Sequence, residues 1–303
     1  MRVYNMVLAP VVLFVYNRIE HLKKSLESLK NNELASESEL FIFSDGPKNA
    51  KDKLKVDAVR AYLKGASGFK QIKIAESPQH LGLKKSVISG VSGILEKYGK
   101  VIVVEDDLLT SPNFLVFMNK ALDFYKDKKW AFSISGFFPE FDINSEYSYD
   151  TVIFPRPSSW GWATWDDRWN KAVWSIKASE IIFNPIEFLR LFKVCGSDLF
   201  IFLLNYKIGR FDSWWIEWVC AHFKNGGSSV FPLKSKVQHI GSDGSGRNSG
   251  VYNRWVADLD VSGKREFNFL PDELFDETIT RDFRRKLTIG LFLKHYFLSW
   301  VKS

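Results

Sequence analysis

The first hundred residues alternate between short apolar runs and longer segments in which apolar residues recur every three or four positions. Apolar runs of this length predict strands, and they occur at residues 10–16, 40–44, 71–75 and 101–104. The intervening segments predict helices over residues 20–31, 55–63 and 83–98, each with one apolar stripe. This order indicates an α/β fold, with right-handed crossovers and a mostly parallel sheet flanked by helices.

The pattern continues less regularly in the second half of the chain. Residues 112–129 predict a helix, residues 130–135 a strand, and residues 237–241 the end of another strand. Residues 142–150 lack periodicity and predict a surface loop, and residues 242–250 are rich in Gly and Ser, as flexible loops are. We expect one domain over residues 1–260, with a nucleotide-binding half (1–107) and an acceptor half (108–260). A helical tail (261–303) follows it.

Composition excludes several classes of protein. Hydrophobic residues make up 46% and aromatic residues 16% of the 303 residues, which is unlike a disordered chain. The two cysteines, Cys195 and Cys220, form no CxxC pattern, so neither a disulfide framework nor a zinc site is expected. Residues 1–9 lack the basic start, long apolar core and cleavage site of a secretory signal, so we expect none, and no run of eighteen apolar residues predicts a membrane span. We therefore expect a cytoplasmic protein.

The net charge of +7 is concentrated in the tail. From Arg281 to Ser303, six Lys or Arg residues stand against one Asp, and apolar residues such as Phe283 and Leu287 share a face. A basic amphipathic helix of this kind suits the surface of an anionic membrane. The alternative is a helix docked on its own domain or on the partner of a homodimer. The rest of the chain is nearly balanced in charge, and we expect no nucleic-acid partner.

Polar residues follow three of the predicted strands directly: Asn17-Arg18, Asp45-Gly46 and Glu105-Asp106-Asp107. Ligands of parallel α/β sheets bind beyond the carboxyl ends of the strands, so these groups are expected to converge. Three adjacent carboxylates repel one another unless a cation lies among them. Mg²⁺ or Mn²⁺ takes such oxygen ligands and keeps positions open for phosphates, which predicts a metal and nucleoside diphosphate site. The alternative is a solvated acidic turn.

Two common nucleotide motifs are absent. No GxGxxG follows the first strand, and no GxxxxGK[ST] occurs anywhere in the chain. The sequence therefore disfavours dinucleotide dehydrogenases and P-loop enzymes.

Residues 8–250 resemble the GT-A glycosyltransferases. The stretches that carry the resemblance are VVLFVYNR, FIFSDGPK, HLGLKKSVISG, VIVVEDDLLTSPNFL and RPSSWGWATWDDRW. The chain is most similar to bacterial polysaccharide and O-antigen enzymes related to N-acetylglucosaminyltransferase I, with EDD in place of the commoner DxD. The resemblance implies a GT-A (Rossmann-like) fold and the metal-dependent transfer of a hexosyl or N-acetylhexosaminyl group. The donor would be a UDP-sugar, the acceptor a glycan or lipid-linked oligosaccharide, and the outcome inversion.

The same resemblance implies roles for residues of the first half. Asp45 would contact the nucleoside base, and Arg18 would lie against the base or the diphosphate. Glu105 and Asp106 would hold the ribose and the donor sugar, while Asp107 would be the direct metal ligand. Arg18 could instead be a surface charge at a helix start.

Three further residues complete the implied donor site. Lys84 matches a position that approaches the donor, although Lys85 could take its role and an exposed lysine is the alternative. Arg247 lies in the loop that would close over the donor and would meet the diphosphate. His239 would complete the metal shell, or would be a structural histidine at a strand end.

The catalytic base is expected in the stretch from Phe211 to Trp218, where two acids lie among aromatic residues. A partly desolvated carboxylate is a better proton acceptor, and an inverting transfer needs one base for the acceptor hydroxyl. Glu217 matches the base-bearing segment of the family, and Asp212 is the rival. Both acids could instead pair with Arg210 or Arg168.

Eight of the eleven tryptophans lie between Trp160 and Trp218. We assign half of them to the core and half to a surface that stacks on sugars.

Two other functions would account for parts of this pattern. A sugar nucleotidyltransferase also uses a parallel sheet and a metal, but residues 8–18 lack its glycine-rich loop. A non-catalytic glycan-binding module would explain the tryptophans, but it has no need of Glu105-Asp106-Asp107.

Overall fold

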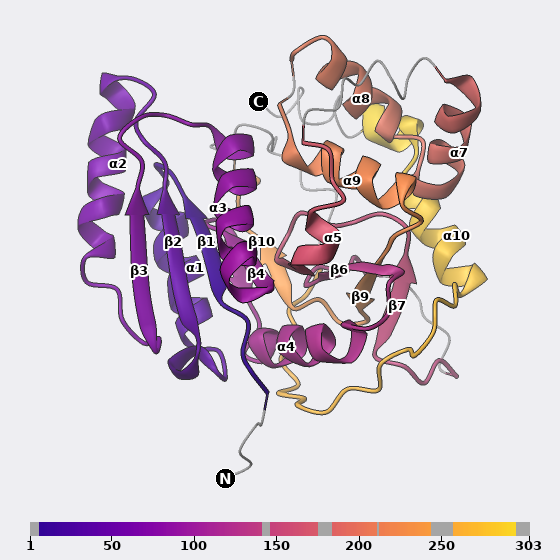
Figure 1. The fold of residues 1–303 in the computed structure, drawn as a ribbon, viewed down its shortest axis with the longest axis horizontal. Helices are drawn as coiled ribbons and strands as arrows, with labels where there is room; N and C mark the ends of the chain where they lie inside the picture. Colours follow the sequence, from indigo (N-terminus) through magenta and orange to yellow (C-terminus); the bar gives the residue numbers. More distant parts are fainter. Residues whose placement is uncertain (1–5, 141–145, 175–183, 211, 244–256, 295–303) are drawn as a thin grey trace.

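A computed structural model of the chain describes residues 6–140, 146–174, 184–210, 212–243 and 257–294. An eight-stranded sheet runs through it in the order β3-β2-β1-β4-β8-β6-β9-β7 (Figure 1). Its strands are β1 (Val11–Val15), β2 (Glu39–Ser44), β3 (Gln71–Glu76), β4 (Lys100–Glu105), β6 (Ala131–Ser135), β7 (Thr151–Phe154), β8 (Trp162–Trp165) and β9 (Ser228–Pro232). A separate ribbon joins β5 (Leu108–Thr110) to β10 (Val237–His239).

The first four strands of the chain are parallel and neighbouring, joined by α1 (Ile19–Lys30), α2 (Ala50–Leu63) and α3 (Leu83–Tyr98). Beyond β4 the sheet changes direction, because β8 pairs antiparallel with both β4 and β6. The predicted α/β fold, with a mostly parallel sheet flanked by helices, is confirmed. Its second half is more mixed than the periodicity alone indicates, since β7 also pairs antiparallel with β9.

Successive residues of the central strands point to opposite faces of the sheet, as strand geometry requires. Leu13 of β1 and Ile102 of β4 belong to one buried cluster with the inner sides of α1 and α2. Val12 and Val103, one position away, belong to a second cluster with α3 and with α9 (Trp214–Lys224). Helices therefore cover both faces, which explains why these strands are continuous apolar runs (Figure 1).

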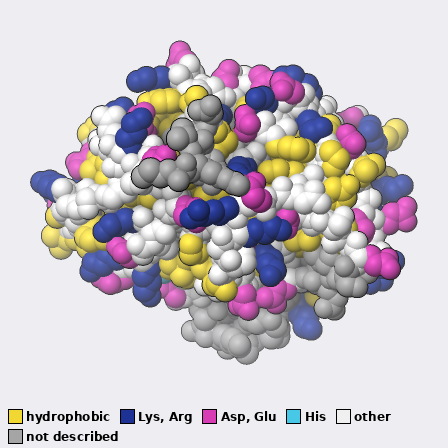
Figure 2. Space-filling view, turned by 90° about the horizontal axis from the view of Figure 1, so that it is seen from below, with side chains coloured by type: hydrophobic (Ala, Val, Ile, Leu, Met, Phe, Trp, Pro, Cys, Tyr) yellow, Lys and Arg dark blue, Asp and Glu magenta, His cyan; other side chains and the backbone are white. Residues whose placement is uncertain are grey.

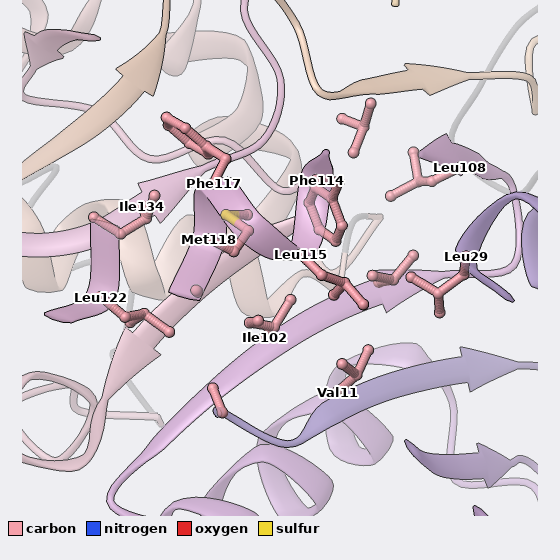
Figure 3. Packing of buried hydrophobic residues seen from close by; sticks show 14 of the residues in the cluster. Val11, Leu29, Ile102, Leu108, Phe114, Leu115, Phe117, Met118, Leu122 and Ile134 are labelled. Carbon is pink, nitrogen blue, oxygen red and sulfur yellow. The ribbon is translucent and has the colours of Figure 1, made fainter. Parts of the chain in front are cut away.

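Helix α4 (Phe114–Tyr125) fills the first of these clusters. Leu115, Met118 and Leu122 lie at helical spacing and face Ile102 of β4, beside Val11 of β1 (Figure 3). The helix starts two residues after Pro112 and ends before Lys129, so it is shorter than the predicted segment. The packing of α4 on the sheet holds the segment that follows β4 in place.

Helix α10 (Glu277–Lys286) docks on the sheet of its own domain. Ile279, Phe283 and Leu287 are buried in a cluster with Phe154 of β7 and Phe231 of β9. The apolar stripe predicted for the tail thus packs inward in this part. The predicted continuous helix is interrupted at Leu287, and residues 295–303 lie outside the described part.

Charged side chains of both signs are interspersed over the face that is seen from below the view of Figure 1 (Figure 2). None of the described helices is both long and apolar enough to cross a membrane.

His222 on α9 gives this core a pH-dependent stability. Its imidazole is fully buried, lies 2.9 Å from the carbonyl of Trp218 and contacts the hydroxyls of Ser133 and Ser229. Burial lowers the pKa of His222 from 6.5 to about 3, against the opposing effect of the Trp218 carbonyl. Below pH 6.5 the unfolded chain therefore binds a proton that the folded chain excludes.

We expect the unfolding free energy to fall between pH 6.5 and 3, with His222 contributing up to about 1.4 kcal/mol per pH unit. Urea unfolding at several pH values measures this effect. The unfolding free energy should fall less steeply with decreasing pH in His222→Gln than in the unsubstituted protein. Equal slopes in the two proteins would show that His222 has no such effect.

Candidate functional site

The carboxyl ends of β1, β2 and β4 lie side by side at one edge of the sheet, since Phe14 is paired with Glu105 and Val15 with Ser44. Arg18 follows β1 as the N-cap residue of α1, and Asp106 and Asp107 follow β4. Parallel pairing thus brings together residues that are almost ninety positions apart in the sequence. Asn17 turns away, and its amide donates to Asp52 of α2 at 3.1 Å.

Arg18 bridges two of the three acids. Its Nη2 lies 2.5 Å from Asp106 Oδ1 and 2.9 Å from Asp107 Oδ2. The side chains are 18%, 5% and 10% exposed, respectively, so the cluster is largely shielded from water. Burial would lower the pKa of Arg18, but the two carboxylates raise it. The guanidinium therefore supplies the positive charge that three adjacent acids need.

The acids differ in their electrostatics. Burial, followed by the charges of Asp107 and Asp106, raises the pKa of Glu105. Burial also raises the pKa of Asp106, against the opposing effect of Arg18. For Asp107, burial is outweighed by hydrogen bonds and charges from His239 and Arg18, which hold its pKa below the ordinary value. Asp107 is therefore the most strongly anionic of the three.

His239 reaches Asp107 through the small ribbon. β10 runs antiparallel to β5, with His239 opposite Leu108, and His239 Nε2 lies 3.4 Å from Asp107 Oδ2. The indole of Trp160 stacks on the imidazole, with ring centroids 4.6 Å apart, and Ser242 Oγ lies 3.2 Å from Nδ1. These contacts fix the ring, so that Nε2 faces the carboxylate.

Gly241 lies against the same cluster. A Cβ at this position would come within 2.5 Å of Asp107 Oδ2, 2.9 Å of His239 Nε2 and 3.1 Å of Arg18 Nη1. Only glycine leaves the three polar groups in their places.

Asp107 and His239 form a two-residue set suited to a divalent cation. Within the described residues there is no group of three or more His, Cys, Asp or Glu side chains that could hold a metal ion. Mg²⁺ and similar ions are often held by one or two protein groups plus substrate phosphates and water, so a two-residue set is sufficient. The residues therefore fit a cation that is bound together with a phosphate-bearing ligand.

Asp45 organises a loop at the end of β2. Its Oδ1 accepts from the backbone N–H groups of Gly46 and Leu81, both at 2.8 Å, and its Oδ2 accepts from Gly82 N–H at 2.9 Å. His80 Nδ1 is also 2.9 Å from Oδ2. These contacts use the acceptor positions of the carboxylate, so a nucleoside base would have to replace one of them.

Lys84, in the first turn of α3, meets the two candidate bases. Its Nζ lies 3.1 Å from Glu217 Oε1 and 3.4 Å from Asp212 Oδ1, and it donates to the Tyr206 hydroxyl at 3.0 Å. Burial would lower the pKa of Lys84, but the hydrogen bonds that it donates to Tyr206 and Glu217 raise it. Neither acid has Arg210 or Arg168 as its partner in these contacts.

The two acids differ in access. Glu217 is 1% exposed, and its Oε1 also accepts from the Tyr206 hydroxyl at 2.5 Å. Its Oε2 is buried and has no hydrogen-bond partner among the described residues. The side chain of Asp212 is 64% exposed. Glu217 is thus held in place with one oxygen unused, while Asp212 is open to solvent.

The remaining site predictions concern Arg247 and the tryptophans. Arg247 lies outside the described residues. Trp162, Trp165, Trp169, Trp214 and Trp218 are buried, and Trp174 and Trp215 pack against buried clusters. Trp160 contacts His239, so the core takes more of the eight tryptophans than the expected half.

Three residues of the site were not singled out from the sequence. Tyr206 lies in α8 (Leu199–Lys207), an apolar run without any visible polar pattern. Trp160 was counted among many tryptophans, and Gly241 carried no signal beyond its place before a Gly/Ser-rich loop. Trp160 and Gly241 can be identified as site residues only once the pairing of β10 with β5 has positioned His239.

No known family model matches this chain, and no match was found among curated proteins. Among solved structures, the chain is similar to the mannosyltransferase PcManGT from Pyrobaculum calidifontis in complex with GDP-Man and Mn²⁺. The identity is 9%, the match covers 58% of this chain and 52% of that one, and the TM-score is 0.39.

It is also similar to S. aureus TarS, at 12% identity over 78% of this chain and 37% of that one, with a TM-score of 0.44. A TarS fragment, 1–349, matches 54% of this chain and 48% of its own length, with 12% identity and a TM-score of 0.36. The chain thus spans about half or less of the length of these proteins. Likeness of this degree assigns no substrate to the chain.

Proposed function

We propose that this protein is a glycosyltransferase that transfers a sugar from a nucleoside diphosphate to a hydroxyl group of a glycan or lipid-linked glycan, with inversion. The observation that carries the proposal is the cluster of Arg18, Asp106, Asp107 and His239 at the carboxyl edge of parallel strands. A guanidinium beside strongly anionic oxygens and an imidazole suits a diphosphate and its counter-cation. The sequence resemblance to GT-A enzymes supports the same reaction, with UDP as the expected nucleotide.

In this proposal, Asp107 and His239 hold the divalent cation, Mn²⁺ or Mg²⁺. When bound, the cation supplies positive charge to the departing diphosphate. Arg18 binds the phosphate oxygens through its two parallel N–H groups. Lys84, at the N-terminus of α3, adds a second positive charge on the side of the acceptor.

The acceptor hydroxyl attacks the anomeric carbon while a carboxylate takes its proton, and the bond from that carbon to the diphosphate oxygen breaks. Glu217 is the proposed base, because its Oε2 has no hydrogen-bond partner in the described part of the chain and Tyr206 fixes Oε1. Because Glu217 is buried, the side chains around it have to shift before an acceptor hydroxyl can reach Oε2. Asp212, held near Lys84 but exposed, is the competing base.

The proposed function is tested by incubating the protein and Mn²⁺ with a panel of UDP-, GDP- and dTDP-sugars and following release of the nucleoside diphosphate. Metal-dependent release from one or a few donors is expected. A sugar nucleotidyltransferase would instead form pyrophosphate from a nucleoside triphosphate and a sugar phosphate. Thermal stabilisation by a glycan alone, without any effect of nucleotide and metal, would favour a glycan-binding module.

We also propose that the protein works at an anionic membrane, through α7 (Pro185–Cys195) and α8 rather than through α10. Ile186 and Leu189 of α7, with Leu204 and Ile208 at the end of α8, are exposed apolar side chains. The exposed charged side chains of residues 184–210 are all basic: Arg190, Lys193, Lys207 and Arg210. Apolar residues among basic ones fit a surface of anionic lipid. Tyr206 on α8 links this surface to Glu217.

The substitution pair Leu204→Gln and Ile208→Gln should reduce binding to phosphatidylglycerol vesicles about tenfold, because insertion of the side chains is lost. Co-sedimentation with vesicles measures this. Leu54→Gln is the matched control, since Leu54 is 77% exposed on α2 but lies outside this surface. An equal loss in the control, or no vesicle binding by the unsubstituted protein, would contradict the membrane proposal.

A further inference from the structure

Arg18 occupies the place at Asp107 that a divalent cation would need. The oxygen that faces His239, Asp107 Oδ2, is also the oxygen that accepts from Arg18 Nη2 at 2.9 Å. The same nitrogen lies 2.5 Å from Asp106. A cation ligated at about 2.1 Å by this carboxylate oxygen would lie close to the guanidinium, and the two positive charges would repel each other.

Moving the guanidinium away from Asp107 removes this conflict. The backbone of Arg18 is anchored, because its carbonyl accepts from Leu22 N–H in the first turn of α1. Its side chain is partly exposed, so it can turn from the carboxylates without unfolding the helix. A diphosphate at the N-terminus of α1 offers the guanidinium replacement acceptors, because Arg binds phosphate as well as carboxylate bidentately.

Gly241 closes the other side of the cluster. A Cβ added there would come within 3.1 Å of polar atoms of Asp107, His239 and Arg18, so a cation placed at that point would meet the guanidinium as well as its two ligands. The site therefore accommodates one positive group at a time.

We propose that Arg18 is an internal counter-ion for the acidic site, and that a divalent cation binds tightly only together with a nucleoside diphosphate that draws the guanidinium away from Asp107. This inference rests on the proposed function. It makes two binding events interdependent: nucleotide raises the affinity for the cation, and the cation raises the affinity for the nucleotide by the same factor.

The test is a Mn²⁺ titration followed by the electron paramagnetic resonance signal of free Mn²⁺, with and without UDP and, separately, GDP. The unsubstituted protein should bind Mn²⁺ weakly alone and at least about tenfold more tightly with the matching nucleotide. Arg18→Gln should bind Mn²⁺ about tenfold more tightly than the unsubstituted protein when nucleotide is absent, and its Mn²⁺ affinity should rise less on adding nucleotide than that of the unsubstituted protein.

Lys23→Gln is the control for net charge, because Lys23 lies on α1 and pairs with Glu20 rather than with the acidic site. Arg18→Lys is the second variant, since it keeps a charge at the site if Arg18→Gln unfolds. It should retain more of the coupling than Arg18→Gln. Circular dichroism establishes that each variant is folded.

Tight Mn²⁺ binding by the unsubstituted protein without nucleotide would overturn the inference, as would unchanged or weaker Mn²⁺ binding by folded Arg18→Gln. An absence of Mn²⁺ binding under all conditions would also overturn it. Its failure is distinguishable from failure of the proposed function. If the protein transfers sugar but Arg18 has no effect on how nucleotide changes Mn²⁺ affinity, only the inference is wrong. If Arg18 controls that change in affinity but no sugar nucleotide supports transfer, only the proposed function is wrong.

Discussion

Asp107→Asn is expected to lower kcat/KM for metal-dependent sugar transfer by roughly 10³-fold. The substitution preserves the shape of the side chain but removes the negative charge that faces both Arg18 and His239. The amide also presents a donor where these two residues require an acceptor. Steady-state kinetics with the donor identified by the sugar-nucleotide panel, and calorimetry of nucleotide binding with and without Mn²⁺, measure the effect.

Calorimetry should show that Asp107→Asn loses the part of nucleotide affinity that depends on Mn²⁺ and keeps the remainder. Asp123→Asn is the control, because Asp123 is an exposed acid on α4 that pairs with Lys126 and should leave transfer unchanged. Activity of Asp107→Asn within about threefold of the unsubstituted protein would remove Asp107 from the proposed metal site.

Glu217→Gln should reduce kcat by 10²-fold to 10⁴-fold, the range that a positioned general base contributes, with little change in donor affinity. Glutamine can still accept a hydrogen bond from Tyr206, but it cannot take the proton of the acceptor. Single-turnover transfer, with donor binding measured separately, distinguishes lost chemistry from lost binding. The discriminating comparison is Asp212→Asn, since a larger loss of kcat there would make Asp212 the base.

The same substitution should also affect stability. Lys84 has only 19% of its side chain exposed, and Glu217 is its buried partner. Removing one partner of a buried ion pair leaves the other charge uncompensated, so urea unfolding should show a loss of about 1–3 kcal/mol. Tyr206→Phe provides a check, because it keeps the ion pair and removes only the hydroxyl. It should change stability less than Glu217→Gln does.

The first half of the fold could be predicted from the sequence because its signals are local. The apolar run at residues 101–104 and the helical stripe at residues 83–98 lie within elements that the structure places at Lys100–Glu105 and Leu83–Tyr98. The strand is a run of four consecutive buried residues, and the helix buries residues that recur every three or four positions. The ends of such elements carry the polar groups, so the candidate site followed from the same pattern.

The second half could not be predicted in the same way, because its elements depend on tertiary contacts. β8 consists of Trp162–Trp165, a segment that the sequence analysis did not predict to be a strand. It becomes a strand because it inserts between β4 and β6, a neighbourhood that no local pattern encodes. The Trp162 ring stacks with those of Trp169 and Trp214, and all three are buried, so these large aromatic surfaces pack in the core.

The charge balance of the acidic run shows the same limit. The sequence argument required a cation among Glu105, Asp106 and Asp107 and concluded that it was a metal. The structure places Arg18 there, because β1 and β4 are neighbours in the sheet. Strand order, which periodicity does not reveal, thus decides which positive charge lies beside the acids. The reason to propose a metal is therefore that Asp107 lies beside His239, and no longer that the three carboxylates repel one another.

The ribbon of β5 and β10 limits how the chain can vary in length. Side chains alternate between faces along a strand, so inserting or deleting one residue between Lys236 and His239 would turn the imidazole away from Asp107. Length changes after Gly241 would leave that alternation intact. Natural variants of this protein should therefore tolerate insertions on the C-terminal side of Gly241 while keeping the spacing before it constant.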